Sequence, residues 1–100
     1  MQFERSTDGD VETLAVRGEL DSLTAPELRP ILEAIAETDP QHVILDLAGL
    51  RLIDSSGVGA IVWLFKRVKA TGGAFEVRGV QGQPRSIFKV LSLDRVFAIE

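Results

Sequence analysis

The sequence contains no cysteine, which excludes disulfides, thiolate metal sites and a cysteine nucleophile. It also lacks an N-terminal apolar segment of the kind that signal peptides carry, and it has no run of roughly 18 apolar residues. We therefore expect neither secretion nor membrane insertion. A cytoplasmic location is the expectation that fits the missing cysteines.

Positive charge is also scarce, because 11 Lys and Arg residues stand against 15 Asp and Glu, for a formal net charge of −4 at pH 7. This balance disfavours binding to the phosphate backbone of nucleic acids. The acidic residues show no recurrent metal-ligand spacing, and the glycines near residue 57 match neither a dinucleotide fingerprint nor a P-loop. The sequence predicts no nucleic-acid partner, no metal and no cofactor.

What the chain does have is enough apolar sequence for one core, with 45% hydrophobic residues in a length of 100. We expect a single α/β domain over residues 1–100. The expected strands cover 2–6, 11–18, 42–47, 74–77 and 95–99, with a turn at 7–10 and a connector at 48–52. Helices are expected from 24, from 54 and over 84–93. This order implies a mixed β-sheet with helices packed against it, parallel where helical crossovers join the strands.

The first and last expected helices carry local signals. Thr24 and Glu27 have the spacing of a capping box, with Pro26 near the helix start, and Asp39-Pro40 ends the helix. Pro30 costs one backbone hydrogen bond in this helix. The expected buried positions are Leu28, Ile31, Leu32 and Ile35 in the first helix, and Ile87, Val90 and Leu91 in the last.

The stretch Asp54-Ser55-Ser56-Gly57-Val58-Gly59 joins the most apolar strand to the longest helix pattern. Asp54 is suited to cap that helix, so both serines fall in the first turn, where backbone N–H groups lack intrahelical partners. The positive end of the helix dipole would tolerate a phosphate on Ser55, although Asp54 would lie beside it. The pattern favours a switch at this site.

The two faces of this middle helix differ in character. An apolar stripe is expected at Val58, Ile61, Val62, Phe65 and Val68, and the opposite face at Ser56, Gly59, Ala60, Trp63 and Arg67. Tryptophan among small residues is typical of an interface anchor. The alternative is that Trp63 is covered by the domain's own chain. The sequence leaves both interpretations open.

A small serine hydrolase is a second functional hypothesis. Acyl transfer needs a base within reach of the nucleophile, and the single histidine, His42, stands at the start of an expected strand, away from Ser55 in sequence. The hypothesis therefore depends on the fold bringing the two together.

Several segments resemble the bacterial anti-sigma-factor antagonists of the STAS class over essentially all 100 residues. They are Gly18-Glu19-Leu20-Asp21, Thr24-Ala25-Pro26-Glu27-Leu28 and, most specifically, Asp54-Ser55-Ser56-Gly57-Val58-Gly59. The resemblance implies a phosphorylation-switched binding module that is not an enzyme. Unphosphorylated, it would sequester an anti-sigma factor that is also a GHKL-type serine kinase, and so release a sigma factor. A PP2C-type phosphatase would reverse the phosphorylation.

By position, the resemblance makes Ser55 the phosphoacceptor. Ser56 is the adjacent hydroxyl, and Asp21 lies on the loop beside the acceptor. The expected partner-binding residues are Asp21, Asp54, Ser56, Gly57, Gly59 and Trp63. The alternative is a STAS interaction domain that binds and controls another regulator, such as one of secretion or of two-component signalling.

Overall fold

The computed structural model describes residues 1–99 as a mixed six-stranded sheet with helices packed against it. The strands are β1 (Gln2–Asp8), β2 (Val11–Leu20), β3 (His42–Asp46), β4 (Leu50–Ile53), β5 (Ala74–Arg78) and β6 (Ala98–Ile99). The helices are α1 (Ala25–Glu37), α2 (Ser55–Ala70), α3 (Gly82–Val90) and the short 3-10 helix η1 (Leu93–Arg95). The expected α/β class and mixed sheet are confirmed.

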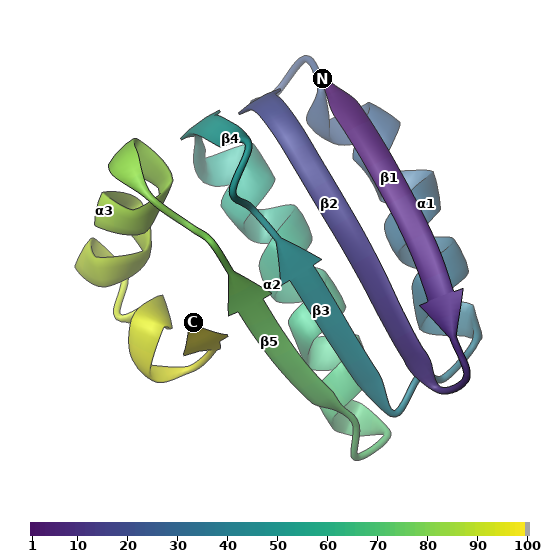
Figure 1. Ribbon diagram of the computed structural model, residues 1–100. Helices are drawn as coiled ribbons and strands as arrows, with labels where there is room; N and C mark the ends of the chain where they lie inside the picture. Colours follow the sequence, from purple (N-terminus) through teal and green to yellow (C-terminus); the bar gives the residue numbers. More distant parts are fainter. Residues whose placement is uncertain (100) are drawn as a thin grey trace.

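The strand order is β1-β2-β3-β5-β6, and β4 pairs with the last residues of β2. β1 is antiparallel to β2, whereas the other pairings between described strands are parallel. Because parallel neighbours end at the same edge of a sheet, the segments that follow β2 and β4 leave the sheet close together. Figure 1 shows both segments at one end of the molecule.

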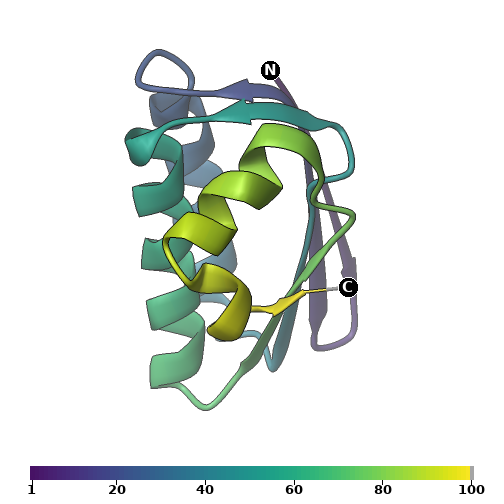
Figure 2. The same cartoon turned by 90° about the vertical axis from the view of Figure 1, so that its left-hand side faces the viewer.

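Helices α1 and α2 lie side by side on one face of the sheet, and α3 lies across the edge near β4 and β5 (Figures 1 and 2). The core fills the space between the sheet and these helices. Its fully buried side chains include Leu14 and Leu45 from the sheet and Leu32, Ile61 and Leu64 from the helices. Burial of this apolar surface, at about 25 cal/mol per Å², fixes the two helices against the sheet.

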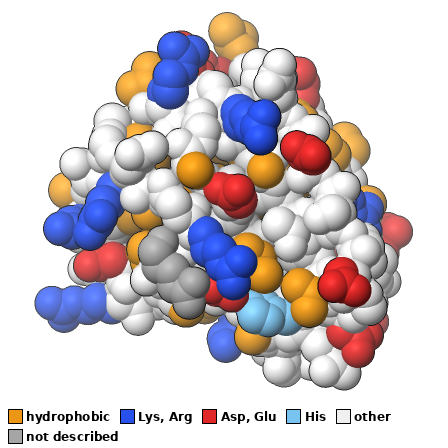
Figure 3. Space-filling view, viewed as in Figure 1, with side chains coloured by type: hydrophobic (Ala, Val, Ile, Leu, Met, Phe, Trp, Pro, Cys, Tyr) orange, Lys and Arg blue, Asp and Glu red, His pale blue; other side chains and the backbone are white. Residues whose placement is uncertain are grey.

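The other face of the sheet has no helix over it, and side chains of both charges are scattered across it (Figure 3). Here the carboxylate of Glu76 lies 2.8 Å from Nε2 of His42 and accepts a hydrogen bond from Nε of Arg78 at 3.1 Å. Glu76 is only 8% exposed, so these charged and polar partners compensate its burial.

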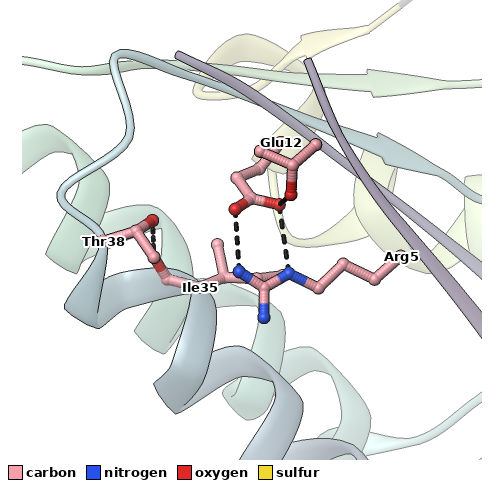
Figure 4. Close-up of polar contacts among 5 residues, drawn as sticks. Arg5, Glu12, Ile35 and Thr38 are labelled. Atoms are coloured by element: carbon pink, nitrogen blue, oxygen red, sulfur yellow. Dashed lines mark hydrogen bonds and ion pairs between the residues drawn. The ribbon is translucent and has the colours of Figure 1, made fainter. Parts of the chain in front are cut away.

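A second buried carboxylate lies between the sheet and α1. Arg5 of β1 donates two hydrogen bonds to Glu12 of β2, at 2.7 and 3.1 Å, and the Thr7 hydroxyl donates a third at 3.0 Å. Figure 4 shows this pair above the end of α1 near Ile35 and Thr38. The Arg5 guanidinium holds the pKa of Glu12 below its ordinary value, against the opposing effect of burial.

The expected connector over residues 48–52 is wrong, because Leu50–Ile53 form β4. Leu50 and Ile53 are buried, whereas Arg51 and Leu52 are exposed. Buried and exposed residues therefore do not alternate along this short strand, and the sequence lacks the pattern that predicts a strand. Its partner is the end of β2, which extends past the expected limit to Leu20. Gly18 lies at the register shift with φ of +103°, a conformation that favours glycine.

The C-terminal segment also differs from expectation. The expected strand at 95–99 is reduced to Ala98–Ile99 and is preceded by η1. In α3 the buried residues are Pro84 and Phe88. Of the side chains expected inside, Ile87 is half-buried against the core, whereas Val90 and Leu91 are 78% and 51% exposed. The ring of Phe88 packs edge-on against Phe97 at a centroid distance of 5.7 Å, and this contact sets the helix orientation.

The expected chain reversals are confirmed. Gly9 forms the turn of the first hairpin with φ of +61°. Gly72 lies just after the end of α2, in a left-handed conformation with φ of +81°. Pro30 lies inside α1 without ending it, and the helix stops at Glu37, before Asp39-Pro40. The buried stripe of α1 is also close to expectation, with Leu28, Leu32, Ile35 and Ala36 buried and Ile31 half-buried.

Candidate functional site

Asp54 caps α2, as the sequence predicts. Its backbone is extended, and its Oδ1 accepts hydrogen bonds from the N–H groups of Ser56 and Gly57 at 2.9 and 3.1 Å. Asp54 is the single residue between β4 and α2, so the sheet edge leads directly into the helix. Ser55 and Ser56 are exposed in the first turn, beside the positive end of the helix dipole.

The second carboxylate oxygen of Asp54 binds the segment that follows β2. Oδ2 accepts the N–H of Ser22 at 3.2 Å, and the Asp54 N–H donates to the carbonyl of Leu20 at 3.1 Å. Ser22 was not predicted as a site residue, and no local pattern signals a contact between these distant segments. The cap of α2 therefore also positions the 21–24 loop against the first turn of α2.

Asp21 organises that loop from within. Its Oδ1 accepts the N–H groups of Leu23 and Thr24 at 2.9 and 3.1 Å, and the Thr24 hydroxyl oxygen accepts the Asp21 N–H at 2.9 Å. This reciprocal pair is a capping box formed by Asp21 and Thr24. The expected box of Thr24 with Glu27 is wrong, since the Thr24 side chain makes no cap bond to α1 and donates to the Glu19 carbonyl at 2.8 Å instead. The carboxylate of Asp21 is thus directed into its own loop.

Gly57 is buried where the first turn of α2 crosses β2 and β4. A Cβ atom at this position would lie 2.7 Å from Cγ of Leu20, 2.8 Å from Cγ1 of Ile53 and 2.9 Å from the Leu20 carbonyl oxygen. These distances are too short for any side chain. The close packing explains why this position takes glycine, and a contact of Gly57 with a partner stays a prediction. Gly59 differs, because it is exposed and a Cβ there would meet no atom within 4 Å.

An open groove of about 630 Å³ runs between α1 and α2 beside the serines. On the α2 side it is lined by Ser55, Ser56, Gly59, Ala60 and Trp63, and on the other side by Ser22, Ala25, Pro26, Arg29, Pro30 and Glu33. Three of the expected site residues, Ser56, Gly59 and Trp63, thus line one groove with Ser55. The α1 side was missed, although the four-residue spacing of Ala25, Arg29 and Glu33 places them on one helix face.

Trp63 combines features of the two interpretations that the sequence left open, an interface anchor and a side chain covered by the domain's own chain. It is half-buried, packs against the edge of the core and lines the groove, with Cζ of Arg67 at 5.2 Å from its ring centroid. The predicted helix phase is partly wrong, because Ala60 is buried while Val62 and Phe65 are only half-buried. The reason is that α2 packs against α1 as well as against the sheet, which widens its buried arc.

The histidine that a serine hydrolase would need lies elsewhere. His42 is at the start of β3, where its Nε2 is 2.8 Å from Glu76. Ser55 comes after the end of β4, so the two residues lie at opposite ends of the parallel strands. Within residues 1–99, the His, Asp and Glu side chains form no cluster of three that could hold a metal ion. None of the helices over this range is long and apolar enough to cross a membrane. The fold therefore does not pair Ser55 with His42, as a serine hydrolase with a histidine base would require.

Comparison with known proteins gives a consistent result. An anti-sigma F factor antagonist of Paenibacillus polymyxa is 29% identical over 100 residues, which cover 99% of this chain and 86% of that protein. The crystal structure of an anti-sigma factor antagonist from Mycobacterium paratuberculosis superposes with a TM-score of 0.88 at 22% identity, covering 98% of this chain and 83% of the other.

The Bacillus cell fate determinant SpoIIAA in its phosphorylated form gives a TM-score of 0.79 at 19% identity, covering 99% of this chain and 91% of the other. The sequence model of the STAS domain family matches residues 2–100 of this chain. The resemblance seen in the sequence is confirmed, and the chain belongs to the STAS domain family.

Proposed function

We propose that this protein is an anti-sigma-factor antagonist that works as a phosphorylation-switched binding module. In its unphosphorylated form it binds an anti-sigma factor that is also a GHKL-type serine kinase, and it thereby releases a sigma factor in the cytoplasm. The observation that carries the proposal is the exposed Ser55 hydroxyl directly after the Asp54 cap, on the rim of the groove that Trp63 lines. The name of the Paenibacillus relative supports the assignment.

Ser55 is the proposed phosphoacceptor. In the transfer, Ser55 Oγ bonds to the γ-phosphorus of ATP, the bond from that phosphorus to the β,γ-bridging oxygen breaks, ADP leaves, and the hydroxyl proton passes to solvent or to a base of the kinase. A PP2C-type phosphatase restores Ser55 with water and releases inorganic phosphate. The chain itself supplies an exposed hydroxyl held at a fixed place by the capped turn.

Phosphorylation weakens partner binding by charge and by fit. The phosphate adds about −1.5 to −2 charge next to Asp54, at a surface that must lose water when the partner binds. A penalty of a few kcal/mol corresponds to a weakening of about ten- to thousandfold, at about 1.4 kcal/mol per decade. The proposed contact surface consists of Ser55, Ser56, Gly59 and Trp63 along α2.

The loop held by Asp21 and Asp54 extends this surface. Leu23 is 83% exposed at its tip, next to Ser22, which lines the groove. An apolar side chain this exposed, beside a residue that lines the groove, gains free energy when a partner buries it. Asp21 and Asp54 act on the partner mainly through the shape of the loop, because their carboxylate oxygens bind backbone N–H groups.

The test is to measure the affinity of the unphosphorylated and the phosphorylated protein for the serine kinase whose gene lies nearest to its own. The protein is phosphorylated with that kinase and ATP, the product is checked by intact mass, and both forms are titrated by calorimetry. We expect a gain of one phosphate and at least tenfold weaker binding of the phosphorylated form. Failure to gain mass, or equal affinity of the two forms, would contradict the proposal.

A further inference from the structure

Arg29 is the one cationic side chain among the described residues that line the groove. It lies on α1, across the groove from Ser55 on α2, and it is exposed. Within residues 1–99, the arginines in ion pairs are Arg5, Arg17, Arg51 and Arg78, whereas Arg29 takes part in none. The guanidinium is therefore available to a new anion in the groove.

Arg67 lies outside the groove lining and stacks on Trp63, with Cζ at 5.2 Å from the ring centroid, and the charged groups nearer to Arg29 and Ser55 are acidic. Glu33 lines the groove one turn beyond Arg29, and Asp54 directly precedes Ser55. A phosphate on Ser55 would be repelled by both carboxylates and attracted by Arg29. Guanidinium binds phosphate oxygens with paired N–H donors, which makes it the strongest match for this group among side chains.

We propose that Arg29 binds the phosphate on Ser55 across the groove, so that phosphorylation links α1 to α2 and closes the mouth of the groove. This step rests on the proposed function, since it takes Ser55 as the acceptor. Phosphorylation then acts in two ways. It adds charge to the contact surface, and it fills with Arg29 the space that a partner side chain would occupy beside Trp63.

The test uses protein with phosphoserine inserted at position 55 during translation, so that no kinase is needed. The pKa of the phosphate is measured by ³¹P NMR titration in the wild type and in Arg29→Gln, Arg29→Lys and Arg85→Gln. Arg85 is a matched control, because it is exposed on α3, away from the groove. All four proteins should unfold at similar temperatures, because both arginines are exposed.

A cation next to the phosphate favours its dianion, so Arg29 should lower the phosphate pKa. We expect the pKa in Arg29→Gln to be higher than in the wild type by about half a unit, with Arg29→Lys between them and Arg85→Gln at the wild-type value. Equal values in the wild type and Arg29→Gln would overturn the proposal. An equal rise in Arg85→Gln would also overturn it, because net charge would then explain the shift.

This result is independent of kinase recognition. If no kinase phosphorylates Ser55, the proposed function fails while the phosphate pKa still reports on Arg29. If the kinase phosphorylates Ser55 but Arg29→Gln leaves the pKa unchanged, the proposed function stands and the Arg29 contact is wrong.

Discussion

The carboxylate of Asp54 accepts a hydrogen bond from the backbone N–H of Ser22 at 3.2 Å, although the two residues are 32 positions apart in sequence. The same carboxylate caps α2 through Ser56 and Gly57. One side chain therefore fixes both the first turn that presents Ser55 and the loop whose Ser22 lines the facing side of the groove. Because both depend on Asp54, a change in this residue alters the whole proposed contact surface.

The capping pair of Asp21 and Thr24 should stabilise the fold without taking part in phosphoryl transfer. Asp21→Ala and Thr24→Ala should each lower the free energy of unfolding by about 0.5–2 kcal/mol. Since both remove the same reciprocal bonds, the double variant should lose less than the sum. Denaturant titration measures these values, and kinase-dependent mass gain of Thr24→Ala should be retained.

Ser86→Ala is a matched control for this pair, because Ser86 is an exposed hydroxyl on α3 that donates to the Gly82 carbonyl at 3.3 Å. Its effect should stay within about 0.5 kcal/mol. Strict additivity of the Asp21 and Thr24 effects would show that the capping box contributes nothing as a unit.

Trp63 should contribute to both partner binding and stability, because it is half-buried and also lines the groove. Trp63→Ala should weaken kinase binding by more than about 1 kcal/mol, or about fivefold, measured well below the melting temperature. The control is Phe65→Ala on the same helix. The Phe65 ring packs at 5.5 Å from Phe75 and 5.2 Å from Phe97, so its loss should lower stability and leave affinity unchanged. If Trp63→Ala behaves as Phe65→Ala does, Trp63 belongs to the core alone.

The pair of Arg5 and Glu12 should make stability depend on pH in the acid range. Arg5 lowers the pKa of Glu12 in the folded protein, so the unfolded chain binds the proton more readily. The resulting stability is present above the unfolded pKa of about 4.3 and is lost as pH falls through the lower folded value. Arg5→Met should be less stable than the wild type by about 1–3 kcal/mol at pH 7, and this gap should narrow below about pH 4.

Denaturant titrations across this pH range measure the gap. Arg17→Met is the matched control, because Arg17 is an exposed arginine with its nearest carboxylate, Glu4, at 3.8 Å. It should change stability by less than about 0.5 kcal/mol at any pH. A constant difference between wild type and Arg5→Met from pH 7 to pH 3 would show that Glu12 is not the titrating group.

Features with strong local signals could be predicted from the sequence. The Asp54 cap, the turn at Gly9, the stop at Gly72 and the buried stripe of α1 each depend on residues close together in the chain. The family motif likewise lies within a few consecutive residues around Ser55.

Features that depend on distant partners could not be predicted. β4 exists because Leu50–Ile53 pair with the end of β2, and the phase of α3 follows from the contact of Phe88 with Phe97. In the site, the bond from Ser22 to Asp54 arises only when β2 and β4 pair, and the position of Arg29 across from Ser55 arises only when α1 and α2 pack together. The burial of Gly57 against Leu20 and Ile53 has the same origin.

Ser55, and not its neighbour Ser56, is the proposed phosphorylation switch. Both hydroxyls are exposed in the first turn, but Ser55 is the first residue of α2, and Ser56 lies about 100° further round the helix. Ser55→Ala removes the acceptor without adding bulk or charge, so it should bind the partner and resist switching. Ser55→Glu places a charge beside Asp54 and should bind more weakly.

The most direct measurement is the intact mass of wild type, Ser55→Ala and Ser56→Ala after incubation with the kinase and ATP. We expect wild type and Ser56→Ala to gain one phosphate and Ser55→Ala to gain none. Undiminished phosphorylation of Ser55→Ala would contradict the assignment of Ser55 as the acceptor.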